Sequence, residues 1–262
     1  ISTGLIAATG TLGQIIPPSI ALVILGDVLA TAYQQSQLKI GNYVAKSLSV
    51  GDLFVAAIVP GFILVIIYGL YFIFTLRKEN IISISDSKDE SFVKLISTLA
   101  PPFFLIFSVL GSIIFGVASP TEAAGIGALG AILIALFYRK LNLKVLSETT
   151  KQSAFISSMV FLILIGASIF SLVFRGLGGE ELITEIFNKI PGGLFGSMIL
   201  VMLLVFILGF ILDFIEITFI VVPIVGPILM VMGADPLWLG IMLAINLQTS
   251  FFCLLYTSPS PR

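Results

Sequence analysis

The stretch GTLGQIIPPS, residues 10–19, is the first place where this sequence could do chemistry. Pro17 and Pro18 lack a backbone N–H and their rings crowd the preceding turn, so both cannot lie inside an undisturbed helix. Unwound backbone frees carbonyl oxygens, which coordinate Na⁺ together with hydroxyl oxygens, and the N-terminus of a half-helix favours a carboxylate. A kink that helps helices to pack is the alternative. The candidate ligands are Gly10, Thr11, Gln14, Pro17, Pro18 and Ser19, with the main-chain carbonyls between Gly10 and Gly13.

A second polar patch near the end of the chain consists of Asn246, Gln248, Thr249 and Ser250. Residues 3–19 and 239–252 share a layout, since each runs from an apolar segment with a glycine near its start into small polar residues. Two similar broken segments in corresponding halves indicate the binding site of a secondary transporter. We therefore expect Asn246, Thr249 and Ser250, with the main-chain carbonyls of residues 246–250, to supply further ion ligands.

Asp213 and Glu216 are carboxylates inside the apolar run 209–227, which also contains two prolines and two glycines. A charge at bilayer depth is costly and normally faces protein, ion or water, and broken backbone is tolerated there only where it is buried or lines a cavity. We expect a re-entrant hairpin at about 209–232. The three-residue spacing places both carboxylates on one helical face. Asp213 suits ion coupling or a hydrogen bond to a helix end. An acid/base pair of an intramembrane enzyme is a third alternative, although paired-carboxylate proteases place their two acids on different helices.

Arg175 ends an apolar segment and precedes the sequence GLGG. Its guanidinium group either reaches back to the membrane interface or binds a substrate carboxylate through two parallel hydrogen bonds. Glu122 follows Ser119-Pro120-Thr121, a pattern that predicts a helix start capped by Ser119 or Thr121 with an acid in the first turn. We assign Glu122 a structural role.

The composition shows what kind of protein carries these residues. The chain has 262 residues, of which 58% are hydrophobic and 10% charged, whereas a soluble domain has about 25% charged residues. The sequence therefore predicts an all-α integral membrane protein. There is no His and only one Cys, Cys253, which excludes His/Cys metal sites and Ser-His-Asp catalysis. A net charge of −1 gives no reason to expect a nucleic-acid partner.

Segments of roughly 20 apolar residues are long enough to span a membrane. They lie at about 4–25, 53–76, 95–116, 122–138, 154–174 and 196–212, with further apolar regions at 214–232 and 237–252. Polar connections separate them at 27–52, 77–94, 139–151 and 175–193. The second and third connections hold four Lys or Arg each and the other two hold two each, so we expect the second and third to be cytoplasmic.

Four blocks resemble a known family: GTLGQIIPPSI (10–20), GDLFVAAIVPG (51–61), GVASPTEAAGIGA (116–128) and the long block 208–250. In these blocks and their spacing, residues 1–251 resemble the large membrane subunit of a tripartite ATP-independent periplasmic (TRAP) transporter, the DctM family. A stand-alone dicarboxylate/sodium symporter of related architecture is the alternative.

The resemblance implies an elevator-type transporter with inverted repeats, each with a re-entrant hairpin and a broken helix. It implies a multi-pass permease in the bacterial inner membrane, not an enzyme. Such a permease imports an organic anion, such as a C4-dicarboxylate, by Na⁺ symport. Na⁺ is then the coupling ion and no cofactor is needed. The implied partners are a periplasmic substrate-binding protein and a small four-helix membrane subunit.

The same resemblance divides the chain. Residues 1–76 would hold the later part of the first repeat and the following span, 77–94 a polar connector, and 95–251 the second repeat with its hairpin. The chain begins with Ile1 inside an apolar segment, so we interpret the sequence as a fragment. The tail FCLLYTSPSPR, residues 252–262, departs from the family pattern, and we interpret it as non-native.

Overall fold

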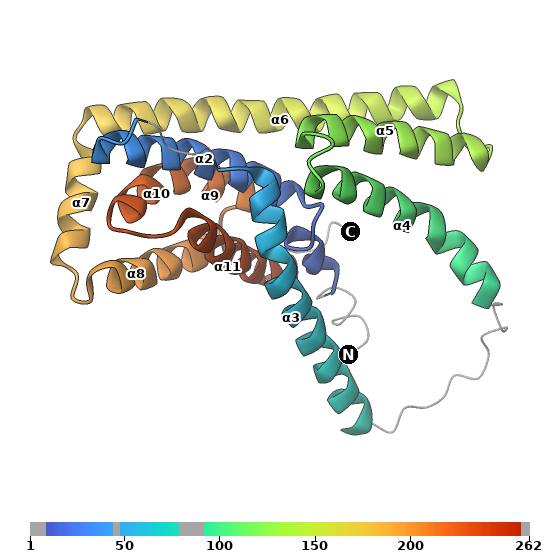
Figure 1. Ribbon diagram of the computed structural model, residues 1–262, viewed down its shortest axis with the longest axis horizontal. Coiled ribbons are helices and arrows are strands. Elements are labelled where there is room, and N and C mark those ends of the chain that lie inside the picture. Colours follow the sequence, from blue (N-terminus) through green and yellow to red (C-terminus); the bar gives the residue numbers. More distant parts are fainter. Residues whose placement is uncertain (1–8, 44–47, 79–91, 258–262) are drawn as a thin grey trace.

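The computed structural model describes residues 9–43, 48–78 and 92–257. Every element within these ranges is a helix, which confirms the all-α fold class (Figure 1). The predicted connector 77–94 and the tail 252–262 lie partly outside the described residues. In chain order the elements are the 3₁₀-helix η1 (Leu12–Gln14) and the α-helices α2 (Ile20–Ile40), α3 (Val50–Lys78), α4 (Phe92–Ile114), α5 (Pro120–Phe137), α6 (Leu143–Gly176), α7 (Gly179–Lys189), α8 (Gly193–Leu208), α9 (Phe214–Ile220), α10 (Val222–Val231) and α11 (Pro236–Thr257).

Four of the described helices are long and apolar enough to cross a bilayer alone, namely Val50–Thr75, Ile96–Ile114, Pro120–Phe137 and Leu143–Gly176. Two bent pairs, α7 with α8 and α9 with α10, add two spans if each pair crosses as one unit. Large apolar side chains such as Phe62, Phe104 and Phe161 are exposed on these helices. Lipid or another membrane helix can cover such surface without the cost that water would impose. The protein is therefore a multi-pass membrane protein.

The predicted polar connections all contain helical residues, most extensively in three of them, which corrects the interpretation of these three as connectors alone. The connection 27–52 includes most of α2, 139–151 includes the start of α6, and 175–193 includes α7. Asn142 caps α6, because its Oδ1 accepts a hydrogen bond from the Val145 N–H at 2.7 Å. In α7, acidic residues occupy the first turn and Lys189 the last, which complements the helix dipole. Polar composition indicated where the chain leaves hydrocarbon, but these residues also satisfy their backbone groups as helices.

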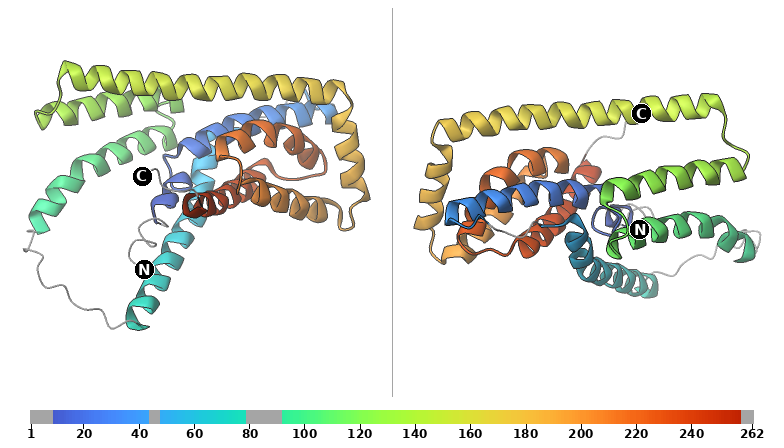
Figure 2. Two further views of the ribbon diagram at one scale, coloured as in Figure 1. Left: turned by 180° about the vertical axis from the view of Figure 1, so that it is seen from behind. Right: turned by 45° about the horizontal axis from the view of Figure 1, so that its top comes forward.

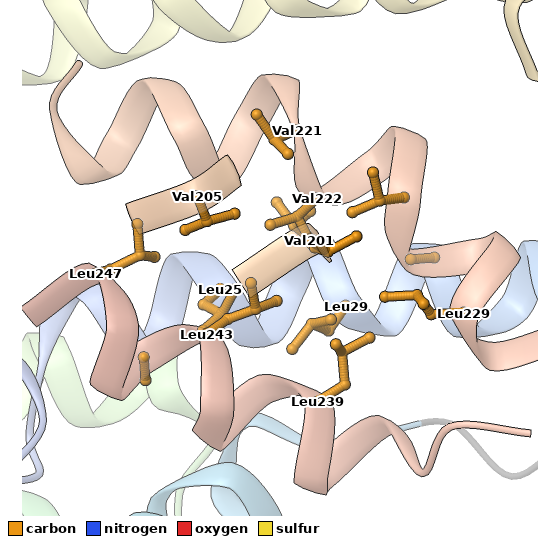
Figure 3. Close-up of a cluster of buried hydrophobic side chains, with 14 of the residues drawn as sticks. Leu25, Leu29, Val201, Val205, Val221, Val222, Leu229, Leu239, Leu243 and Leu247 are labelled. Atoms are coloured by element: carbon orange, nitrogen blue, oxygen red, sulfur yellow. The ribbon is translucent and has the colours of Figure 1, made fainter. Parts of the chain in front are cut away.

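The hydrophobic core forms around α2, which packs against α10 and α11 and is closed by α8 (Figure 3). Leu22, Leu25 and Leu29 recur every three or four residues along α2 and are at most 1% exposed, so one face of this helix is buried. Gly240 allows α11 to approach α2 and α3 closely. A Cβ added there would lie 2.7 Å from Leu29 Cδ1 and 2.8 Å from Leu53 Cδ1.

The chain reverses direction in the turn at residues 209–213, between α8 and α9 (Figures 1 and 2). The two helices that follow, α9 and α10, are bent by 53° relative to each other, and α7 and α8 by 119°. The region predicted as a re-entrant hairpin at about 209–232 therefore consists of this turn followed by the bent pair α9–α10, with α8 leading into it. The turn brings Asp213 to the start of a helix rather than to its middle.

Candidate functional site

The proline-containing segment 10–19 interrupts the helix as predicted: η1 covers Leu12–Gln14, and α2 begins only at Ile20. Ser19 is the N-cap of α2 and has extended backbone, with φ −117° and ψ 130°. Its Oγ accepts a hydrogen bond from the Leu22 N–H at 3.2 Å and donates one to the carbonyl oxygen of Gln14. One hydroxyl group therefore links the end of η1 to the first turn of α2.

This break is partly buried in protein. Thr11 and Ser19 are each 2% exposed, and Pro17 is also buried, whereas Gly13 and Pro18 are exposed. The 3₁₀-helix η1 packs against α2, α3 and α11. Irregular backbone at membrane depth is stable only where protein buries it or where it lines a cavity. The burial agrees both with a functional break and with a kink that helps helices to pack.

The later end of α11 lies beside η1, so the two predicted polar patches belong to neighbouring elements (Figures 1 and 2). Their side chains do not all meet. Asn246 and Thr249 line an apolar cavity of about 520 Å³ between α8 and α11. Asn246 Nδ2 donates a hydrogen bond to the Met202 carbonyl oxygen at 2.7 Å, and Thr249 Oγ1 donates to the Ile245 carbonyl oxygen at 2.9 Å. Ser250 belongs to α11, but its side chain lies outside what the structure describes.

Gln248, on another face of α11, is buried. It is 4% exposed, and its Oε1 has no hydrogen-bond partner within the described part of the chain. Leaving a buried acceptor unsatisfied costs about 1–3 kcal/mol, so such an atom needs an explanation. The described residues contain no cluster of three or more His, Cys, Asp or Glu. Gln248 itself offers a neutral amide oxygen.

Asp213 occupies the start of α9. Its backbone is extended, and its Oδ1 accepts a hydrogen bond from the Phe214 N–H at 2.8 Å. Asp213 therefore precedes α9, so the two carboxylates are not both part of one helical face; Glu216 lies in the first turn. At the start of α5, Ser119 and Glu122 form the predicted cap: Glu122 Oε2 accepts a hydrogen bond from the Ser119 N–H at 2.8 Å.

Arg175 lies in the last turn of α6 and faces a cavity of about 350 Å³, here named the α2–α6 groove. Its polar lining is Asp27, Thr31 and Gln35 on α2 and Ser168, Ser171 and Arg175 on α6. Phe219 and Pro223, from the bent pair, line it between the two helices. Gln35 lies 16 residues after Ser19 on one helix, about 24 Å at 1.5 Å per residue. Arg175 lies at the Gln35 end of the groove, because the Lys39–Glu180 ion pair joins the chain just beyond these two residues. The structure therefore does not bring Arg175 to the break.

Sequence reasoning missed the groove, and the signal that could have found it was helical periodicity. Asp27, Thr31 and Gln35 recur every four residues and so lie on one face of α2. The polar composition of residues 27–52 predicts a connection and thereby hides this helical spacing.

Comparison with known proteins places this architecture in a family. Residues 1–253 match the sequence profile described as "Tripartite ATP-independent periplasmic transporter, DctM component". The chain is 30% identical over 246 residues to the C4-dicarboxylate TRAP transporter large permease protein DctM of Rhodobacter capsulatus, covering 94% of this chain and 55% of the relative. It is 26% identical over 251 residues to the sialic acid TRAP transporter large permease protein SiaM of Vibrio cholerae, covering 94% and 54%.

A further relative is the ectoine/5-hydroxyectoine TRAP transporter large permease protein UehC of Ruegeria pomeroyi, 25% identical over 244 residues, covering 92% of this chain and 53% of the relative. The chain thus spans about half the length of the curated relatives it matches. The profile covers almost the whole chain, and the broken helices, apolar spans and buried proline break agree with the resemblance carried by the sequence blocks. The chain therefore belongs to the DctM component family of tripartite ATP-independent periplasmic transporters.

Proposed function

We propose that this chain is part of a permease that imports an organic anion, such as a C4-dicarboxylate or a related organic acid, by symport with Na⁺. Its partners would be a small four-helix membrane subunit and a periplasmic substrate-binding protein, in the bacterial inner membrane. The family is one of transport permeases, so the intramembrane enzyme is set aside. Relatives are named for C4-dicarboxylate, sialic acid and ectoine, and membership alone therefore does not select the solute.

The observation that carries the proposal is the contact between the buried break and the later end of α11. Broken backbone at 15–19 offers carbonyl oxygens, and the buried hydroxyl of Thr11 lies one residue before η1. Gln248 adds a buried side-chain oxygen on α11. Neutral oxygens of this kind coordinate Na⁺ in secondary transporters.

Coupling follows from charge. A site of neutral oxygens does not balance an organic anion by itself, so a bound Na⁺ would help to offset the substrate charge. In the proposed cycle the break and the hairpin region carry ion and substrate across the membrane together. Asp213 supports this cycle by capping α9, and Asn246 by holding α11 to α8.

The test is Na⁺-dependent uptake in proteoliposomes that contain the full-length permease, its small membrane subunit and its binding protein. Thr11→Val removes a buried hydroxyl at nearly constant volume, and Gln248→Leu removes a buried amide. We expect each to raise the Na⁺ concentration for half-maximal uptake at least tenfold, while the matched variants Thr150→Val and Gln152→Leu, which alter exposed side chains of α6, leave it unchanged.

An unchanged Na⁺ dependence in both Thr11→Val and Gln248→Leu would remove these two side chains from the proposed ion site. Uptake at full rate without the binding protein would instead support the stand-alone symporter. Uptake that ignores the Na⁺ gradient in the unmodified complex would contradict symport itself.

A further inference from the structure

Two polar stripes line opposite walls of the α2–α6 groove. On α2 the stripe recurs every four residues, and on α6 it recurs every three to four residues, so each is one face of its helix. A polar stripe that faces lipid is costly, and charged residues in spanning segments normally face a protein interior or a water-filled cavity. The groove gives both stripes a shared hollow in the protein to face, with Phe219 and Pro223 between its two walls.

The ends of the groove differ in charge. α2 and α6 run in the same direction (Figure 1), and an ion pair between Lys39 and Glu180 holds the last turn of α2 to the first turn of α7. Gln35 is four residues before Lys39 and Arg175 is five before Glu180, so Arg175 lies at the Gln35 end.

Asp27 is eight residues before Gln35, about 12 Å along the helix at 1.5 Å per residue. Arg175 and Asp27 both line the groove, and no ion pair within the described residues joins them. The groove therefore carries a cation at one end and a carboxylate at the other.

The middle of the groove combines an apolar surface with one buried hydroxyl. Val28, Ala32 and Leu164 form apolar wall between the charged ends. Ser171 is 7% exposed and lines the groove, and its Oγ has no hydrogen-bond partner among the described residues. Serine in a helix commonly donates to the carbonyl four residues earlier, as Ser158 and Ser168 do. Ser171 instead leaves a buried, unsatisfied hydroxyl in the groove wall.

We propose that the α2–α6 groove binds a zwitterionic organic solute. Its carboxylate would accept two parallel hydrogen bonds from the Arg175 guanidinium, its cationic group would lie against Asp27, and its carbon chain would cover the apolar wall beside Ser171. A simple anion gains from Arg175 but is repelled by Asp27, and a simple cation meets the reverse. Only a ligand with both charges satisfies both ends. The site lies outside the break, and the proposal does not depend on the transport cycle above.

The test is calorimetric titration of the full chain in lipid nanodiscs with three compounds of equal length, ε-aminohexanoate, hexanoate and hexylamine. We expect ε-aminohexanoate to bind at least tenfold more tightly than either singly charged analogue, because each charge-assisted contact contributes about a factor of ten or more. β-Alanine, which carries the same two charges on a shorter chain, should bind at least tenfold more weakly than ε-aminohexanoate.

Variants test which side chain binds each charge of the ligand. Arg175→Met should reduce ε-aminohexanoate affinity at least tenfold, to that of hexylamine, and Asp27→Asn should reduce it to that of hexanoate. Lys189→Met and Asp235→Asn, which change charges outside the groove, should leave the affinity unchanged.

Equal binding of all three probes would overturn the proposal, as would equal binding of β-alanine and ε-aminohexanoate. The proposal also fails if ε-aminohexanoate does not bind and Asp27→Asn, Arg175→Met and the double variant all lower Tm by the same amount. Equal losses of Tm would mean that the two side chains pair with each other.

Discussion

Ser19→Ala tests whether one hydroxyl holds the proline break to α2. The change removes the N-cap acceptor of the Leu22 N–H and the donor to the Gln14 carbonyl. Loss of a serine cap costs about 1 kcal/mol, and a buried carbonyl that loses its donor costs about 1 kcal/mol more. The sum of about 2 kcal/mol corresponds to a roughly thirtyfold increase in opening of the first turn of α2.

Hydrogen–deuterium exchange of the protein in nanodiscs measures this opening directly. Amides of residues 22–25 should exchange about thirtyfold faster in Ser19→Ala, whereas amides of α10 should not change. Ser19→Thr keeps a hydroxyl and should restore most of the protection. Ser158→Ala, which removes an exposed hydroxyl bonded within α6, is the matched control. Unaltered exchange at residues 22–25 in Ser19→Ala would refute the reasoning.

Three further changes test the packing. Gly240→Ala puts a Cβ 2.7 and 2.8 Å from leucine methyl groups of α2 and α3, and such overpacking should cost about 1–3 kcal/mol and lower Tm in detergent, whereas Gly166→Ala, with no heavy atom within 4 Å of its Cβ, should not lower it. Gly196→Ala puts a Cβ 2.3 Å from a main-chain carbonyl oxygen at the α7–α8 bend, which cannot rotate away, so its Tm should fall further than that of Gly240→Ala. Lys39→Met removes an ion pair whose side chains are 44% and 24% exposed, so it should change the unfolding free energy by less than about 1 kcal/mol and abolish part of its salt dependence. A salt-independent Lys39→Met effect would assign the loss to packing of its methylene groups.

Much of the fold follows from the sequence because lipid imposes strong requirements on it. The apolar segments at 53–76, 95–116 and 122–138 correspond closely to α3, α4 and α5, since a single segment inside a bilayer satisfies all its own backbone groups only as a helix. The interruption at 10–19 was predictable from Pro17 and Pro18, and the start of α5 from Ser119 and Glu122. Each of these depends on local chemistry that one stretch of residues contains.

The packing of the helices against one another was harder to predict from the sequence. The sequence layout predicted that the patches at 10–19 and 246–250 correspond, but not that Asn246 and Thr249 would face α8 while Gln248 is buried. That division depends on the rotation of α11 about its axis, which packing against α2 and α8 sets. Likewise, Arg175 and Asp27 meet one groove only because α6 and the bent pair α9–α10 enclose it with α2.

The length of α6 supplies a scale for depth in the membrane. Its 34 residues extend about 51 Å at 1.5 Å per residue, and the hydrocarbon layer is about 30 Å thick. To fit within that layer α6 would have to tilt by more than 50°, beyond the usual range of about 0–40°. Part of α6 therefore stands in water.

The positions of the charged residues on α6 identify the part of this helix that crosses the membrane. Between Lys151 and Arg175 the helix has no charged residue, and these 24 steps extend about 36 Å. The stretch matches one crossing of the bilayer, with Lys151 at one interface and Arg175 at the other. The guanidinium end of the α2–α6 groove then lies near the water boundary, while the carboxylate of Asp27 lies roughly 12 Å further along α2. A solute entering from that side would meet the cation first and the carboxylate last.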